Sequence, residues 1–257
     1  MVKDRAFYRT ILRIALPSAF QGFISLFVVL VDNMMVASLG DTVLAGVAQS
    51  NGITAFFTAA VSGLVGGSSV LISQYWGKKD MDRIRRIFAI VTWMCLGVAA
   101  IFLTVILIIP GGVLRLLVSD GAIIEAALPY FRLVCWSYLP YAISAALVGM
   151  LRSVEIVRVT LYTTVLSLVT NIGLNYVFIY GKLGMPAMGA QGAALATVIA
   201  RCVELLLVWL YTFRMQKAFE IRPRDLLKGD KTLAKDYARY GLPVGIVDAQ
   251  WAVVGVC

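Results

Sequence analysis

A single acidic residue, Asp32, lies within the first long apolar stretch of the chain. On a helical wheel it falls within about 60° of three polar residues of the same stretch; these are Ser18, Gln21 and Ser25. A carboxylate inside a membrane span costs about 2.5–3.5 kcal/mol, so it is tolerated where it meets water, a cation or a proton. Asp32 therefore fits reversible binding of a sodium ion or a proton. Because it lies only six residues before Ser38, where the stretch ends, an acid solvated at the membrane surface is the alternative.

A second apolar stretch, residues 160–180, carries polar residues along one helical stripe. Five of its polar residues recur at steps of four, three, four and four; they are Thr160, Thr164, Ser167, Asn171 and Asn175. An amide without a partner in hydrocarbon costs several kcal/mol, so this stripe must face protein or water. Two interpretations remain open: a hydrogen-bonded seam between helices, or one wall of a polar chamber through which a solute passes.

Several classes of chemistry find no support in the sequence. The 257 residues include no histidine, which removes the commonest metal ligand and the usual proton carrier at neutral pH. The four cysteines form no CxxC pair and are interpreted as small buried side chains. A GxxxxGK[ST] phosphate-binding loop is also absent. We therefore expect neither an enzyme nor a bound cofactor, and we assign any cation or proton binding to carboxylates and neutral oxygens.

The composition indicates which elements position these residues. Hydrophobic residues make up 60% of the chain and charged residues 14%, with a mean hydropathy of +0.86, which is far more apolar than soluble domains are. Each long apolar stretch can cross the hydrocarbon core of a bilayer. We predict an all-α integral membrane protein, a six-helix bundle followed by a partial seventh helix from about residue 237. The six predicted spans are Ile11–Ser38, Val43–Tyr75, Ile84–Ile109, Ile123–Met150, Val159–Tyr180 and Ala187–Phe213.

Lysine and arginine are distributed unevenly between the two sides of this bundle. The N-terminus and the even-numbered loops carry 19 of them, whereas the odd-numbered loops carry only Arg115 and Lys182. By the positive-inside rule, the N-terminus is cytoplasmic and the protein is a multi-pass protein of the cytoplasmic (inner) membrane. The net charge of +9 is then explained by basic loops that contact anionic membrane lipid, and nucleic acid is not an expected partner.

The long polar connection after the sixth span divides the chain. We predict an N-terminal six-helix lobe over residues 1–214, a cytoplasmic linker over 215–236, and the start of a truncated second lobe over 237–257. The tetrapeptide YGLP at 240–243 echoes IALP at 14–17. Such an echo is typical of transporters built from repeated helix bundles.

Other residues within the spans have more ordinary interpretations. Arg201 precedes Glu204 by three residues, a spacing that predicts a local ion pair. A GxxxG pair that ends at Gly67 predicts close helix packing. Pro17 and Pro140 each remove one helical hydrogen bond and permit a bend. A bend at Pro17 would move Asp32.

Several stretches resemble the multidrug and toxic compound extrusion (MATE) family. The longest is NIGLNYVFIYGKLGMPAMGAQGAALATVIAR at residues 171–201, which resembles the fifth and sixth helices of that family. VDNMMVASLG at 31–40 and VLAGVA at 43–48 resemble its first helix and the following turn. SQYWGKKD and WSYLPYAISAALVGMLRS also fit. The resemblance extends over nearly the whole chain.

The resemblance implies a transporter with two six-helix lobes around a V-shaped cavity, which exchanges cationic or amphipathic compounds for sodium ions or protons. Asp32 matches the acid that couples cations in one branch, and Asn171 and Thr197 match its polar partners. Pro17 matches a proline proposed to bend the first helix. Asn175 departs from that branch, which has a second aspartate at this position. The amide argues against a proton mechanism with two carboxylates.

Taken together, we expect a cation-coupled antiporter, driven by Na⁺ or H⁺, that exports cationic or amphipathic drugs. Asp32 would hold the ion, and the lining would come from residues on three helices; they are Gln21, Ser25, Asn171, Asn175 and Thr197. Family members are nearly twice as long, so this chain would be an N-lobe fragment that does not transport without its missing C-terminal lobe. One alternative is a flippase for lipid-linked oligosaccharides, which needs a cationic cavity to bind phosphates; Arg132 is the candidate for such a positive charge. The other is a non-transporting membrane fragment or partner subunit.

Overall fold

The computed structural model describes residues 5–215, 231–241 and 243. Within the first helix the described side chains begin at Leu16 and leave out Pro17, Ser18 and Ser25. All regular elements of this described part are helical, and six helical segments are long and apolar enough to cross a membrane. The predicted all-α bundle of six spans is thereby confirmed.

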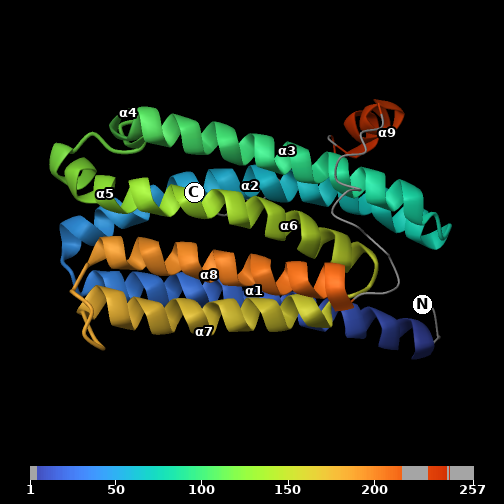
Figure 1. The fold of residues 1–257 in the computed structure, drawn as a ribbon, viewed down its shortest axis with the longest axis horizontal. Coiled ribbons are helices and arrows are strands. Elements are labelled where there is room, and N and C mark those ends of the chain that lie inside the picture. The colour runs from blue at the N-terminus through green and yellow to red at the C-terminus, as the bar shows by residue number, and fades with distance from the viewer. Residues whose placement is uncertain (1–4, 216–230, 242, 244–257) are drawn as a thin grey trace.

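The six spans are built from seven long helices, with a 3₁₀ turn within the fourth span and a π-helical turn at the end of the sixth; Figure 1 shows their arrangement. They begin with α1 (Arg5–Ala37), α2 (Asp41–Gly77) and α3 (Met81–Ile108), and α3 is followed by the short α4 (Pro110–Leu114). The fourth span consists of α5 (Gly121–Val134) and α6 (Tyr138–Ser153). The fifth and sixth are α7 (Arg158–Tyr180) and α8 (Ala190–Leu210), and α8 continues as a π-helical turn, Tyr211–Met215.

Local chemistry accounts for several helix boundaries. The Asp80 carboxylate accepts from the backbone N–H of Arg83 at 3.2 Å and caps α3, and Asp120 caps α5 by accepting from Ala122 at 2.9 Å. Both satisfy backbone donors that have no partner within the helix. Gly181 ends α7 in the left-handed region at φ 65°, where a Cβ would lie 2.7 Å from the backbone nitrogen of Ala187.

The fourth span is not one regular helix. A 3₁₀ turn, Cys135–Ser137, joins α5 to α6. Pro140 lies at the third residue of α6 and cannot donate to the carbonyl four residues earlier, which belongs to this turn. The predicted interruption at Pro140 therefore appears just before the proline.

The bundle has two sides. α7 packs chiefly against α1 and α8, whereas α2 packs against α3, α5 and α6. Figure 1 shows α1, α7 and α8 side by side. In the α2 side, the Phe57 ring stacks on Tyr138 with centroids 4.2 Å apart. Apolar side chains also cover the outer surface of α1, as expected where a helix faces lipid or another apolar helix; examples are Leu16, Phe23, Leu26, Leu30 and Met34.

The connections alternate between the two ends of the bundle, as the charge pattern predicts. The start of α1, the α2–α3 turn, the α6–α7 connection and α9 (Lys231–Asp236) lie at one end, and the α1–α2 and α7–α8 connections lie at the other (Figure 1). The basic loops thus share one end. The cytoplasmic assignment of that end remains a prediction.

Residues 231–241 pack against the bundle, with α9 on α3 and the turn that follows it on α2. A π-helical turn, Tyr237–Gly241, follows α9, and the buried Tyr237 hydroxyl donates to the carbonyl of Leu64 at 2.7 Å. Gly67 meets the backbone of Gly241 so closely that a Cβ at Gly67 would overlap it. The predicted packing role of Gly67 therefore has a specific partner. Most of the predicted linker (216–230) and of the predicted seventh span (242 and 244–257) lies outside the described residues.

Candidate ion-binding site

Asp32 is bound directly to the fifth span. The Asn175 side-chain amide in α7 donates to Oδ1 of Asp32 at 2.5 Å. Asp32 itself is half-buried, about 7 Å before the end of α1. The hydrogen bond shows that the acid points toward the bundle interior and not toward lipid.

The contact extends into a network over three helices. Nδ2 of Asn175 also lies 3.3 Å from Oδ1 of Asn171, one turn earlier in α7. Asn171 in turn donates to the Thr197 hydroxyl of α8 at 3.4 Å. Thr197 completes the series by donating to the carbonyl of Ala193 at 3.0 Å. Four of the predicted site residues are thus brought together: one carboxylate and three neutral oxygen-bearing groups.

The network contains one oxygen atom, Oδ1 of Asn175, that accepts no hydrogen bond within the described residues. Asn171 and Asn175 are both buried, with Asn175 fully inaccessible. Within the described part of the chain, the buried Oδ1 atoms of Asn33 and Asn175 accept no hydrogen bond. A buried amide oxygen without a donor is costly, and carboxylate and amide oxygens are the ligands that hard cations prefer. The residues present therefore fit a cation as well as a proton on Asp32.

Two buried tyrosines missed by the sequence patterns bond to polar residues of α2. Tyr130 of α5 donates to Oδ1 of Asn51 at 3.1 Å, and it interacts electrostatically with Asp32. Tyr138 shares a hydrogen bond of 2.9 Å with Thr54. No periodic pattern marks these tyrosines in the sequence, because only tertiary packing brings them to the polar side chains of α2.

An ion pair lies one helical turn beyond Thr197. Nη1 of Arg201 contacts Oε2 of Glu204 at 2.7 Å, which confirms the predicted local pair. The guanidinium also lies over the Tyr141 ring, 5.1 Å from its centroid. The positive charge of Arg201 acts on Asp32. Arg201 thus belongs to the electrostatic environment of the site, although sequence analysis gave it only a structural role.

The other members of the α7 stripe also bond to protein. Thr160 donates locally, to the carbonyl of Val157. Ser167 donates to the Ala200 carbonyl in α8 at 3.0 Å. The stripe therefore faces protein, as predicted, and Ser167 fits the interpretation as a seam between helices. A polar chamber through which a solute passes stays a prediction.

Gln21 does not join Asp32. It donates to the Thr164 hydroxyl at 2.7 Å and accepts from Arg152, in a second polar cluster. Eleven residues separate Gln21 from Asp32, which is about 16 Å along α1. The side chains of Pro17 and Ser25 lie outside the described residues, although their backbone belongs to α1.

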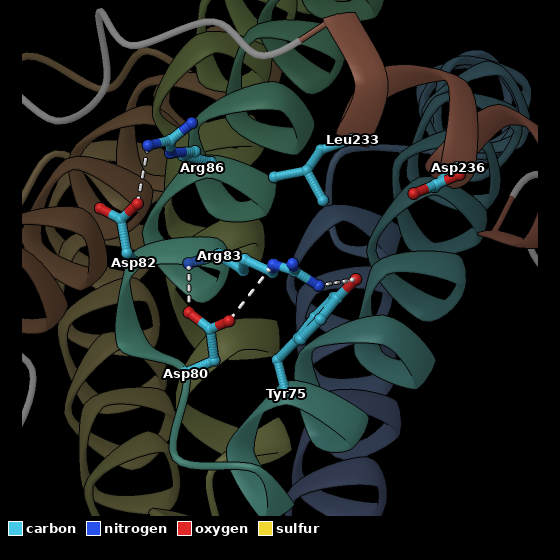
Figure 2. A pocket seen from close by; sticks show the side chains of 7 residues that line it. All are labelled: Tyr75, Asp80, Asp82, Arg83, Arg86, Leu233 and Asp236. Carbon is cyan, nitrogen blue, oxygen red and sulfur yellow. Dashed lines mark hydrogen bonds and ion pairs between the residues drawn. The ribbon is translucent and has the colours of Figure 1, made fainter.

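A cavity of about 420 Å³ lies at the opposite end of the bundle from Asp32. Figure 2 shows its lining, contributed by the α2–α3 corner and α9. Its charged groups are largely paired: Arg83 contacts Asp80 at 3.2 Å, and Arg86 contacts Asp82 at 2.7 Å. Asp236 of α9 also faces the cavity. This cavity is formed where α9 docks and is separate from the predicted ion site.

The fold and the site define a multi-pass membrane protein in which a half-buried acid, Asp32, belongs to a polar network over three helices. A family model described as MatE matches residues 17–177. The chain therefore belongs to the MATE family of transporters, as its sequence motifs predict.

Relatives and solved structures agree with this assignment. The chain is 28% identical over 248 residues to the probable multidrug resistance protein NorM of Streptococcus pneumoniae. The aligned region covers 95% of this chain and 54% of that protein. The chain is also 28% identical over 186 residues to the probable multidrug resistance protein YoeA of Bacillus subtilis, covering 72% of this chain and 40% of that one.

Among solved structures, a multidrug resistance MATE family transporter in an outward-facing conformation matches 93% of this chain and 52% of its own, with a TM-score of 0.82 at 24% identity. At that identity the likeness supports the fold alone. The chain spans about half the length of the curated relatives that it matches.

Proposed function

We propose that this chain forms the N-terminal lobe of a cation-coupled antiporter that exports cationic or amphipathic compounds. The observation that carries the proposal is the hydrogen-bonded series from Asp32 through Asn175 and Asn171 to Thr197. A buried acid in a membrane span is costly. Repeated binding and release of a cation is a physical reason for an acid at this position.

The geometry suggests how ion binding would change the protein. Asp32 is tied to α7 by the Asn175 amide. A sodium ion or a proton on Asp32 competes with that hydrogen bond, because both draw on the same carboxylate oxygens. Loading would thus alter how α1 pairs with α7, and a bend near Pro17 would convert that change into altered access to the site. A cationic drug that competes with the coupling ion for the Asp32 carboxylate would then be exchanged for that ion.

The composition of the site bears on which ion couples. With Asn175 in place of a second acid, the network holds one carboxylate. Sodium would use Asp32 together with neutral oxygens, whereas a proton needs Asp32 alone. Both ions fit these residues, and the unused acceptor oxygen of Asn175 is a further ligand that sodium would use.

The surrounding charges argue against the flippase alternative. A site for the phosphates of a lipid-linked oligosaccharide needs uncompensated positive charge within the cavity. Arg201, the arginine whose charge reaches Asp32, is paired with Glu204, and Arg132 is exposed on α5. We therefore favour a cationic substrate.

Export would require the other half of the transporter. We propose that a second lobe, together with this one, encloses the substrate cavity, and that the N-terminus faces the cytoplasm from the inner membrane. Without that lobe the chain would bind the coupling ion but would not transport. The transporter hypothesis and the non-transporting fragment hypothesis therefore predict the same lack of transport by this chain alone.

Ion binding can be tested on the purified chain in detergent. The thermal unfolding midpoint is measured as sodium replaces choline at constant ionic strength, and separately as pH is varied without sodium. We expect one of the two cations to stabilise the wild type, since a ligand that binds only the folded state raises its stability. Asp32→Asn should remove this effect and leave membrane insertion intact. Equal stabilisation of Asp32→Asn and wild type would mean that Asp32 is an acid of the membrane surface.

A further inference from the structure

Arg201 lies next to the proposed ion site without belonging to its hydrogen-bonded network. It follows Thr197 by one helical turn of α8, a spacing that brings Cβ atoms to about 5–6 Å on the same face. Thr197 is the α8 member of the network. Arg201 and Asp32 interact electrostatically.

Two contacts fix the Arg201 guanidinium. Its Nη1 donates to Oε2 of Glu204 at 2.7 Å, and its plane lies over the ring of Tyr141 in α6. Glu204 is buried, with 7% of its surface exposed. The Arg201 side chain is 38% exposed, and an ion pair that is partly open to solvent contributes little net stability. Stability alone is therefore a weak reason for this pair.

The charges of the three groups suggest another reason. A lone Arg201 beside Asp32 would leave the site with no net charge, and the guanidinium would compete with any incoming cation for the carboxylate. Glu204 cancels the charge of Arg201 by pairing with it, and within the described residues it forms no hydrogen bond with the Asp32 network. The site then keeps the single negative charge of Asp32.

We propose that Glu204 is a positioning residue that reserves Asp32 for a cation by binding Arg201. This inference rests on the proposed function of Asp32 as the ion-binding acid. In this proposal Glu204 does not contact the ion or the substrate. By neutralising Arg201 it makes the site select a positively charged ligand.

The test is a double-mutant cycle read through the sodium concentration that gives half-maximal stabilisation of the purified chain. Glu204→Gln should raise this concentration about tenfold, the size of an ordinary coupling between sites. Arg201→Gln should lower it, because Glu204 then adds negative charge near the ion. The double variant Arg201→Gln/Glu204→Gln should return to within about twofold of the wild type, since the two charges cancel. If the lobe binds protons instead, the pH midpoint of stabilisation should fall in Glu204→Gln and rise in Arg201→Gln. Tyr130 is the other titratable group that interacts electrostatically with Asp32.

The control is Glu125→Gln, which removes one negative charge from an exposed position on α5 and should leave the sodium midpoint unchanged. A purely structural role for the pair predicts lower unfolding temperatures without sodium in both single variants, with unchanged sodium midpoints, and that result overturns the proposal. If Glu204→Gln does not fold, Arg201→Gln decides: a sodium midpoint equal to or above that of the wild type refutes the inference. The proposed function is judged separately by Asp32→Asn, whose retained sodium response would remove Asp32 from the site whatever Glu204 does.

Discussion

Replacing Asn175 by aspartate tests the reasoning about the site most sharply. The variant puts a second carboxylate where the amide now lies 2.5 Å from Oδ1 of Asp32. Two unit charges about 4 Å apart repel by about 4 kcal/mol at an effective dielectric constant of about 20. That repulsion is large enough to keep the pair from being doubly ionised near neutral pH unless a cation lies between them.

The expected result is a sodium site with a new pH dependence. At alkaline pH, Asn175→Asp should bind sodium at least about tenfold more tightly than the wild type, because the ion relieves the repulsion. At acidic pH the pair retains a proton that sodium must displace, so this advantage should disappear. The assay is sodium-dependent thermal stabilisation of the purified chain at both pH values.

The matched control is Asn175→Ser, which removes the amide without adding a charge and should weaken sodium binding at both pH values. The reasoning is refuted if Asn175→Asp has the sodium midpoint of the wild type at both pH values. That outcome would mean that the ion does not lie between α1 and α7.

Two further predictions concern stability away from the site. Gln21→Leu removes the amide that bonds to both Arg152 and Thr164 and should lower the free energy of unfolding by about 1–3 kcal/mol. The sodium midpoint should stay unchanged, and a shift would show that this cluster belongs to the ion site. Tyr237→Phe removes the hydrogen bond to α2 and should cost about 1 kcal/mol, measured as the denaturant midpoint; no change would contradict the docking of this turn on α2.

Much of the site could be predicted from helical periodicity. The acid of the first span and the amides of the fifth were each placed on a polar stripe, and the structure joins them through the Asp32–Asn175 hydrogen bond. Periodicity works here because unpaired polar groups in hydrocarbon are costly, so polar stripes must face each other. Thr197 was found only through the family resemblance.

The remaining features depend on information that a helical wheel lacks. A helical wheel gives the angular position of a residue around the helix but not its position along the axis. It therefore groups Gln21 with Asp32, although about 16 Å of helix separates them. The partners Tyr130 and Arg201 depend on how α5 and α8 are rotated toward α1, which no single stretch encodes. The docking of Tyr237 on α2 joins residues that are 173 positions apart.

The most direct test of the central claim is to observe the Asp32 carboxyl group while the ion binds. Infrared difference spectra of the purified chain, with and without sodium and between acidic and alkaline pH, report whether a carboxylate gains a cation or a proton. We predict a carboxyl band that responds to one of these ions in the wild type and is missing in Asp32→Asn. A band of equal size in both proteins would contradict the account, because the ion would then bind elsewhere.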